Sequence, residues 1–156
     1  MNITVLAVGK LKERWYKEAC AEYVKRLGAY AKVRMVEVSD RDPATCGGEA
    51  PAREREGEDI CRAIRPSDHV VLLDVRGTER SSEDISQHMD DLALHGTVDL
   101  VFVIGGSTGV SEAVRSRADE RLSFGRITLP HELARVVLLE QLYRSFRISR
   151  GEPYHK

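Results

Sequence analysis

The last three residues of the chain carry side chains that can both form hydrogen bonds and move a proton. Tyr154, His155 and Lys156 follow Pro153, whose fixed φ limits the directions that the tail can take. Histidine is the side chain whose ordinary pKa lies near neutrality, so His155 is the natural proton acceptor for a weakly acidic group. Chain ends are usually frayed, and a tail without function is the alternative interpretation.

Two further candidates lie upstream of the tail. His131 follows Pro130 and precedes the last segment with a helical pattern, so it is either a catalytic group or simply a residue at a helix N-terminus. Glu140, Arg144 and Arg147 share one face of that helix at positions i, i+4 and i+7. Arg144 is the candidate for holding a phosphate or a developing negative charge, and a surface Glu–Arg pair is the alternative.

A glycine-rich stretch, Gly105-Gly106-Ser107-Thr108-Gly109, follows the apolar run that ends at Ile104. Glycines let backbone N–H groups approach a ligand closely, because no Cβ intervenes. The spacing is GGxxG, which is neither the GxGxxG of dinucleotide-binding folds nor a P-loop with its lysine. A ligand-binding loop and a tight turn between strand and helix are both compatible with it.

The elements that must position these residues alternate between strand and helix. Apolar runs predict strands over 2–8, 69–75 and 99–104, and alternation of apolar and polar residues predicts one over 33–38. A last short strand is expected over 126–129, where Pro130 ends it. Helical patterns cover 13–27, 52–64, 82–94 and 132–146, with a short helix after Ser111. Ser81 and Ser111 are the candidate N-caps of the helices that follow them, and Asp84 completes a capping box with Ser81.

The order of these elements predicts a single α/β domain with a largely parallel sheet and helices on both faces. Residues 39–51 are rich in proline and glycine, and we expect them to form a mobile loop. In an open parallel sheet, ligands bind beyond the carboxyl ends of the strands. Three such ends are prominent: one after Leu73, one at the loop 105–109 and one over 124–130.

Composition sets limits on the class of protein. At 156 residues the chain has the length of one domain, and its hydrophobic fraction of 42% is enough for a core without disulfide bonds or structural metals. Cys20, Cys46 and Cys61 lack a metal-binding spacing, so we expect reduced thiols and no metal. No apolar run approaches the ~20 residues that span a bilayer, and no signal peptide is evident. A cytoplasmic protein without membrane contact is the expectation.

The net charge of −1 is unevenly distributed. Residues 121–156 contain seven basic and three acidic side chains, so the local charge is +4 and the rest of the chain carries −5. A basic C-terminal third on an acidic body can bind a polyanion at one place and repel it elsewhere. A surface that is arginine-rich without binding anything is the alternative.

The final helix has an unusual pattern. Six of the seven residues 133–139 are apolar, with Arg135 the exception. A helix that is apolar nearly all round is buried on more than one side. In a small domain this pattern suggests a subunit interface, and a helix packed beneath the sheet is the alternative.

These motifs together resemble the SPOUT-class, trefoil-knotted methyltransferases, and among them those that act on N3 of a pseudouridine in large-subunit ribosomal RNA. The resemblance covers essentially the whole chain, and the order and spacing of the motifs carry it. The matching segments are Leu6-Ala7-Val8-Gly9-Lys10-Leu11-Lys12, Glu22-Tyr23, Lys25-Arg26-Leu27, residues 102–109, Thr128-Leu129-Pro130-His131, residues 135–144 and Tyr154-His155-Lys156. Residues 39–51 cannot be aligned with the family by inspection.

The resemblance implies a knotted region over 100–156, an obligate homodimer and S-adenosylmethionine as the cofactor, with no metal. It implies contacts to the cofactor from Leu73, Gly105, Gly106, Phe124, Gly125, Arg126, Ile127, Thr128, Leu129 and Pro130. These residues occupy the three strand ends identified above. It also implies that one subunit's tail covers the other's cofactor. The candidate catalytic residues are then Tyr154, His155, Arg144 and His131, because N3 must lose a proton before it accepts a methyl group.

Two other classes of function stay open from the residues. A dinucleotide-dependent oxidoreductase would need GxGxxG after the first strand, where this chain has only Gly9. A non-catalytic protein that binds the cofactor or RNA and regulates would share the same motifs. That second class predicts cofactor binding without turnover on ribosomal particles.

Overall fold

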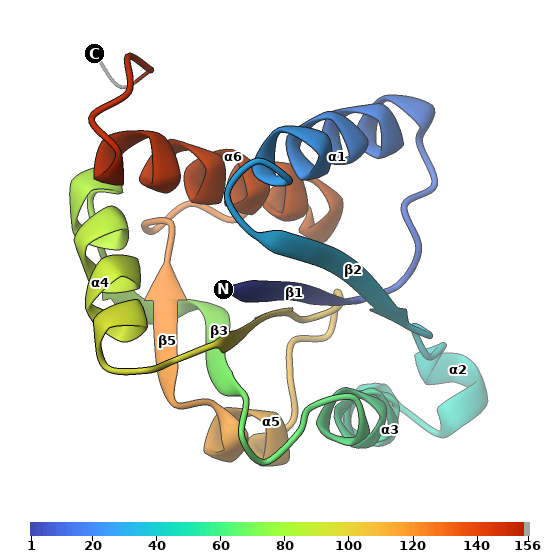
Figure 1. Cartoon of the computed structure of the whole chain (residues 1–156). Helices are drawn as coiled ribbons and strands as arrows, with labels where there is room; N and C mark the ends of the chain where they lie inside the picture. Colours follow the sequence, from blue (N-terminus) through green and yellow to red (C-terminus); the bar gives the residue numbers. More distant parts are fainter. Residues whose placement is uncertain (155–156) are drawn as a thin grey trace.

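Five strands form one sheet in the order β2-β1-β4-β3-β5, and the neighbouring strands are parallel (Figure 1). The computed structural model describes residues 1–154. The strands are β1 (Asn2–Val8), β2 (Lys32–Val38), β3 (His69–Glu79), β4 (Asp99–Ile104) and β5 (Glu120–Ser123). The helices are α1 (Arg14–Leu27), α2 (Pro43–Cys46), α3 (Glu49–Arg62), α4 (Ser82–Leu94), α5 (Glu112–Arg117) and α6 (His131–Ser149). The predicted α/β class and parallel sheet are confirmed.

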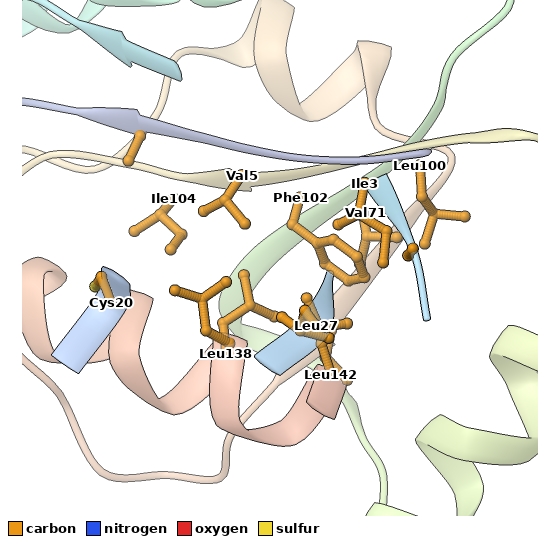
Figure 2. Close-up of a cluster of buried hydrophobic side chains, with 14 of the residues drawn as sticks. Ile3, Val5, Cys20, Leu27, Val71, Leu100, Phe102, Ile104, Leu138 and Leu142 are labelled. Atoms are coloured by element: carbon orange, nitrogen blue, oxygen red, sulfur yellow. The ribbon is translucent and has the colours of Figure 1, made fainter. Parts of the chain in front are cut away.

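Helices cover both faces of the sheet, as the apolar runs predict. Alternate residues of β1 enter two separate cores: Ile3 and Val5 pack with α1, α4 and α6, whereas Leu6 and Val8 pack with α3 and α5. Figure 2 shows the first core, in which strand side chains such as Phe102 face the helices. A strand that is buried on both faces has no polar alternation, because neither side meets water.

The two predicted serine caps are confirmed. The Ser81 side chain accepts the Asp84 N–H, and the Asp84 carboxylate accepts the Ser81 N–H in return. Ser111 caps α5 by accepting the Val114 N–H. Each cap supplies an acceptor for a helix N–H that lacks a partner within the helix.

Two predicted segments differ from the structure. Residues 39–51 were expected to be a loop, but they contain α2 and the first residues of α3; Asp42 caps α2 and accepts the Ala44 N–H. The strand expected over 126–129 is wrong, and β5 lies earlier, at Glu120–Ser123. There Leu122 is buried against β3, whereas Ile127 is 67% exposed. The segment with Ile127 and Leu129 as its apolar residues therefore forms no strand.

Helix α6 packs against the sheet between α1 and α4, and its buried residues include Leu138, Leu139 and Leu142 (Figures 1 and 2). The packing of α6 beneath the sheet explains the apolar pattern within one chain. Within residues 1–154, no helix is both long enough and apolar enough to cross a membrane. The three cysteines are free thiols.

Arg135, the polar exception in the apolar run, is fully buried. Its Nη2 donates to the carbonyl oxygens of Val8 (3.0 Å) and Gly9 (2.7 Å), and its Nη1 pairs with Glu37 (2.9 Å). The same Glu37 oxygen accepts the Leu11 N–H. One guanidinium therefore joins the start of α6 to the carboxyl ends of β1 and β2.

We predict that Arg135→Ala lowers the free energy of unfolding by at least about 3 kcal/mol, because it leaves buried carbonyl groups and a carboxylate without their partner. Urea denaturation measures the loss. Arg14→Ala is the control, since Arg14 forms a surface pair with Glu18 and its side chain is 90% exposed. Similar small losses for both variants would contradict the anchoring role of Arg135.

Candidate functional site

A cleft of about 860 Å³ lies at the carboxyl edge of the sheet, where the predicted strand ends meet. This volume is typical of a site for a small organic ligand. The cleft is lined by residues 73–76, 104–107, 109–110, 112, 115, 121–122, 124–125, 127–131 and 134. Nine of the ten predicted cofactor residues line it; the lining does not include Arg126, which is exposed.

The first wall of the cleft is an irregularity in β3 rather than the end of that strand. The register between β3 and β5 shifts between Leu73 and Thr78, so the backbone here leaves the regular ladder. The Asp74 carboxylate accepts the Arg76 N–H at 2.9 Å and lies 3.7 Å from the Arg121 guanidinium. The bulge therefore turns residues 74–76 toward the ligand space.

The second wall is the glycine loop, and a different constraint requires glycine at each of its three glycine positions. Gly109 has a φ of +82° and forms an isolated bridge with Gly106. A Cβ on Gly105 would lie 2.6 Å from Val110 Cγ1, and a Cβ on Gly106 would lie 3.0 Å from Val8 Cγ1. Side chains at these positions would push the loop out of place, so the backbone itself forms this surface of the cleft.

The third wall is the segment 124–130, which is held at its start by Ser123. The Ser123 hydroxyl accepts the Gly125 N–H at 3.1 Å, and Gly125 has a φ of +101°. Ile127 of this wall is 67% exposed, and Val75 of the first wall is 57% exposed. Exposed apolar side chains beside backbone N–H and C=O groups suit a ligand that has a flat apolar part and polar edges.

The structure brings His131 to the cleft but not Arg144 or Tyr154. His131 begins α6 and lines the cleft, close to Gly9 at the end of β1. Arg144 is 13 residues further along the same helix, which corresponds to about 20 Å at the helical rise per residue. Tyr154 follows the end of α6 in the chain, and its ring lies beside Arg144. His155 and Lys156 lie outside the described residues.

Arg144 and Tyr154 share one acidic partner, Glu140. The Arg144 guanidinium pairs with the Glu140 carboxylate at 2.6 Å and lies 4.7 Å from the centre of the Tyr154 ring. The Tyr154 hydroxyl donates to the same carboxylate at 3.2 Å. Burial, together with hydrogen bonds to Tyr23 and Glu140 and the negative charge of Glu140, raises the pKa of Tyr154 to about 12. Tyr154 is therefore a neutral hydrogen-bond donor at neutral pH.

The tail is held by Arg147 and by Tyr30, a residue that the sequence motifs did not single out. Tyr30, in the turn after α1, donates to Glu152, and Arg147 pairs with Glu152 at 2.8 Å. Arg147 also donates to the Pro153 carbonyl oxygen at 3.3 Å. Hydrogen bonding to Glu152 raises the pKa of Tyr30, which keeps it protonated as a donor. Tyr30 and Glu152 are 122 residues apart in the chain, so no local spacing could reveal that contact.

The basic C-terminal third is largely neutralised. Of its six arginines, four have acidic partners: Arg121 with Asp74, Arg135 with Glu37, Arg144 with Glu140 and Arg147 with Glu152. Arg126 and Arg150 are exposed. Glu140 and Glu152 are already included in the local charge of +4, so Asp74 and Glu37 from outside the segment lower it to +2. Among residues 1–154, no group of three or more His, Cys, Asp or Glu side chains is arranged to hold a metal ion.

Comparison with known proteins gives one consistent result over the whole chain. A family model described as a predicted SPOUT methyltransferase matches residues 1–155. The chain is 53% identical to the ribosomal RNA large subunit methyltransferase H of Pelotomaculum thermopropionicum, with 99% of this chain and 98% of that protein covered. It is 51% identical to the protein of the same name from Listeria monocytogenes and 50% identical to one from Desulfitobacterium hafniense, with at least 99% of each chain covered. The cleft, the glycine loop and these full-length matches show that the chain belongs to the SPOUT methyltransferase family.

Proposed function

We propose that this protein transfers a methyl group from S-adenosylmethionine to N3 of a pseudouridine in 23S ribosomal RNA, on assembled ribosomal particles in the cytoplasm. Methyl transfer to large-subunit ribosomal RNA follows from the names of relatives that are about half identical over the full chain. The observation that carries the rest is the cleft, whose three walls are the segments that the family resemblance assigns to the cofactor. A trefoil knot over 100–156 and a homodimer are parts of the same proposal.

The cleft residues fit S-adenosylmethionine. Exposed Val75 and Ile127 offer apolar surface to the adenine ring, and the backbone of the glycine loop offers hydrogen bonds without side chains in the way. Asp74 and Glu112 place carboxylates near arginines on the rim, so the lining carries charges of both signs for an amino-acid group. We assign the cofactor to Leu73, Gly105, Gly106, Phe124, Gly125 and 127–130 on this basis.

The bound cofactor supplies a methyl group on a positively charged sulfur, a leaving group that needs no further activation. The protein has to orient the target ring and accept its N3 proton as the N–CH₃ bond forms and the S–CH₃ bond breaks. We assign proton acceptance to His155, because Tyr154 is a protonated donor beside Glu140. His131, in the cleft wall, is the second candidate for this role.

We further propose that the active site combines two subunits. Within one chain, His131 and the cleft lie at one end of α6, and Arg144 and Tyr154 lie at the other end, about 20 Å away. The contacts of Tyr30 and Arg147 with residues 152–153 hold the tail at that far end. A second copy of the chain could bring its own tail over this cleft. Arg144, with Tyr154, would then meet the RNA there.

A non-catalytic regulator that binds the cofactor or RNA is the alternative, and one experiment separates the two. The purified protein is incubated with labelled S-adenosylmethionine and ribosomal particles that lack the modification, and the RNA is digested for nucleoside mass analysis. We expect one methyl group on a pseudouridine of 23S RNA. Cofactor binding by calorimetry without any methylated nucleoside would favour the regulator instead.

The state of Tyr154 gives a prediction on pH. Because its pKa is raised to about 12, Tyr154 keeps its proton throughout the neutral range and cannot be the group that titrates there. We predict that Tyr154→Phe lowers the methylation rate about tenfold through the lost hydrogen bond, without moving the apparent pKa of the rate. Single-turnover rates at a series of pH values test this. A clear shift of the apparent pKa in the variant would make Tyr154 the proton acceptor.

Mixed dimers test whether the site is composite. One variant carries Gly105→Val, which disturbs the cleft because even a Cβ there would lie 2.6 Å from Val110 Cγ1. The other lacks residues 154–156. Each variant alone should be nearly inactive. After subunit exchange in equal amounts, half of the dimers pair one intact cleft with one intact tail, so we expect about one quarter of the wild-type activity.

No recovery in the mixture, with exchange of subunits shown by mass spectrometry, would place cleft and tail of one chain in the same site. The control is the truncated variant's affinity for S-adenosylmethionine, which should stay close to that of the wild type because the described tail residues do not line the cleft of their own chain. A single size by light scattering for both variants checks that they remain dimers.

A further inference from the structure

A buried carboxylate lies behind the glycine loop and takes no part in the mechanism described so far. Glu56, on α3, is 4% exposed. Its Oε1 accepts the Arg41 N–H at 2.8 Å. Its Oε2 is buried and has no hydrogen-bond partner among the described residues. The carboxylate therefore has half of its accepting capacity in use.

The second oxygen faces the back of Gly106. A Cβ on Gly106 would lie 3.3 Å from Glu56 Oε2, and Gly106 lines the cleft with its other side. The absence of a side chain at Gly106 thus brings the loop backbone directly against the carboxylate. A single residue separates Glu56 from the ligand space.

Helix α3 holds the same loop at two more points. The Arg53 guanidinium donates to the Thr108 carbonyl oxygen at 3.0 Å. Gly57 packs against Ser111, the cap of α5, so closely that a Cβ on Gly57 would lie 2.1 Å from the Ser111 hydroxyl oxygen. Arg53, Glu56 and Gly57 form one face of α3, because residues three and four apart are neighbours on a helix. This face is the support on which the glycine loop rests.

A buried carboxylate with one free oxygen is expensive, and an amide of the same shape would be tolerated as well or better by the fold. A group that burdens stability in this way is commonly kept for function. A carboxylate accepts hydrogen bonds at both oxygens, whereas an amide accepts at one and donates at the other. A glutamate at position 56 is therefore needed in place of a glutamine only if a donor also reaches Oε2.

We propose that Glu56 is a positioning residue for the cofactor: its Oε2 accepts a backbone N–H of the glycine loop when the cleft is occupied. The loop is then held from behind by Glu56 while its front surface contacts the ligand. This inference rests on the proposed cofactor, S-adenosylmethionine. It assigns to α3, which does not line the cleft, a direct influence on affinity.

The test compares Glu56→Gln with Glu54→Gln, a matched change at an exposed position of α3. Calorimetry with S-adenosylmethionine and with its demethylated product gives the dissociation constants, and thermal unfolding of the ligand-free protein gives stability. We expect Glu56→Gln to weaken binding of both ligands about tenfold, since one charge-assisted hydrogen bond is lost. Its ligand-free unfolding midpoint should stay the same or rise. Glu54→Gln should behave as the wild type.

Steady-state methylation adds a second readout. The Glu56→Gln variant should show a raised KM for S-adenosylmethionine and a kcat close to wild type, because Glu56 acts on the loop and not on the reacting atoms. Wild-type affinity in Glu56→Gln, or a loss of affinity that only follows a fall in the unfolding midpoint, would overturn the proposal. If the wild-type protein itself fails to bind S-adenosylmethionine, the proposed cofactor is wrong, and that outcome is distinct from the first two.

Discussion

The position of α6 depends on one buried guanidinium. Arg135 is held by two backbone carbonyl groups at the end of β1 and by Glu37 at the end of β2. These three hydrogen bonds offset the cost of burying the charge, so the start of α6 has little freedom to move along the sheet. This contact fixes where the cleft receives His131. Through the rigid helix, it also fixes where Arg144 and the tail come to lie.

Much of this architecture could be predicted from the chain. Apolar runs located four of the five strands, and Ser81 and Ser111 marked two helix starts, because capping chemistry is local. The strand expected over 126–129 failed since apolar residues at a ligand cleft resemble a buried strand. The helices within 39–51 were missed because proline and glycine mark turns and also begin and end helices, as Pro43 and Gly47 do in α2.

The candidate site was predicted in part for the same reasons. Cofactor residues follow strand ends, a rule of parallel sheets, so three segments distant in sequence could be named together. What could not be predicted is pairing across the chain. Arg135 looked like a break in an apolar pattern, and the basic surface near the C-terminus looked more open than it is. Charge counted along a sequence does not show which carboxylate lies opposite each arginine.

The 19 residues of α6 connect the cleft at one end with the tail at the other. A helix fixes both the distance between its two ends and the rotation of one end relative to the other. Adding one residue between His131 and Arg144 would move the far end by about 1.5 Å and turn it by about 100°. The tail would then point away from Tyr30, its partner outside α6, although the contacts within α6 could still form. The length of this helix is therefore a quantity that selection can act on directly.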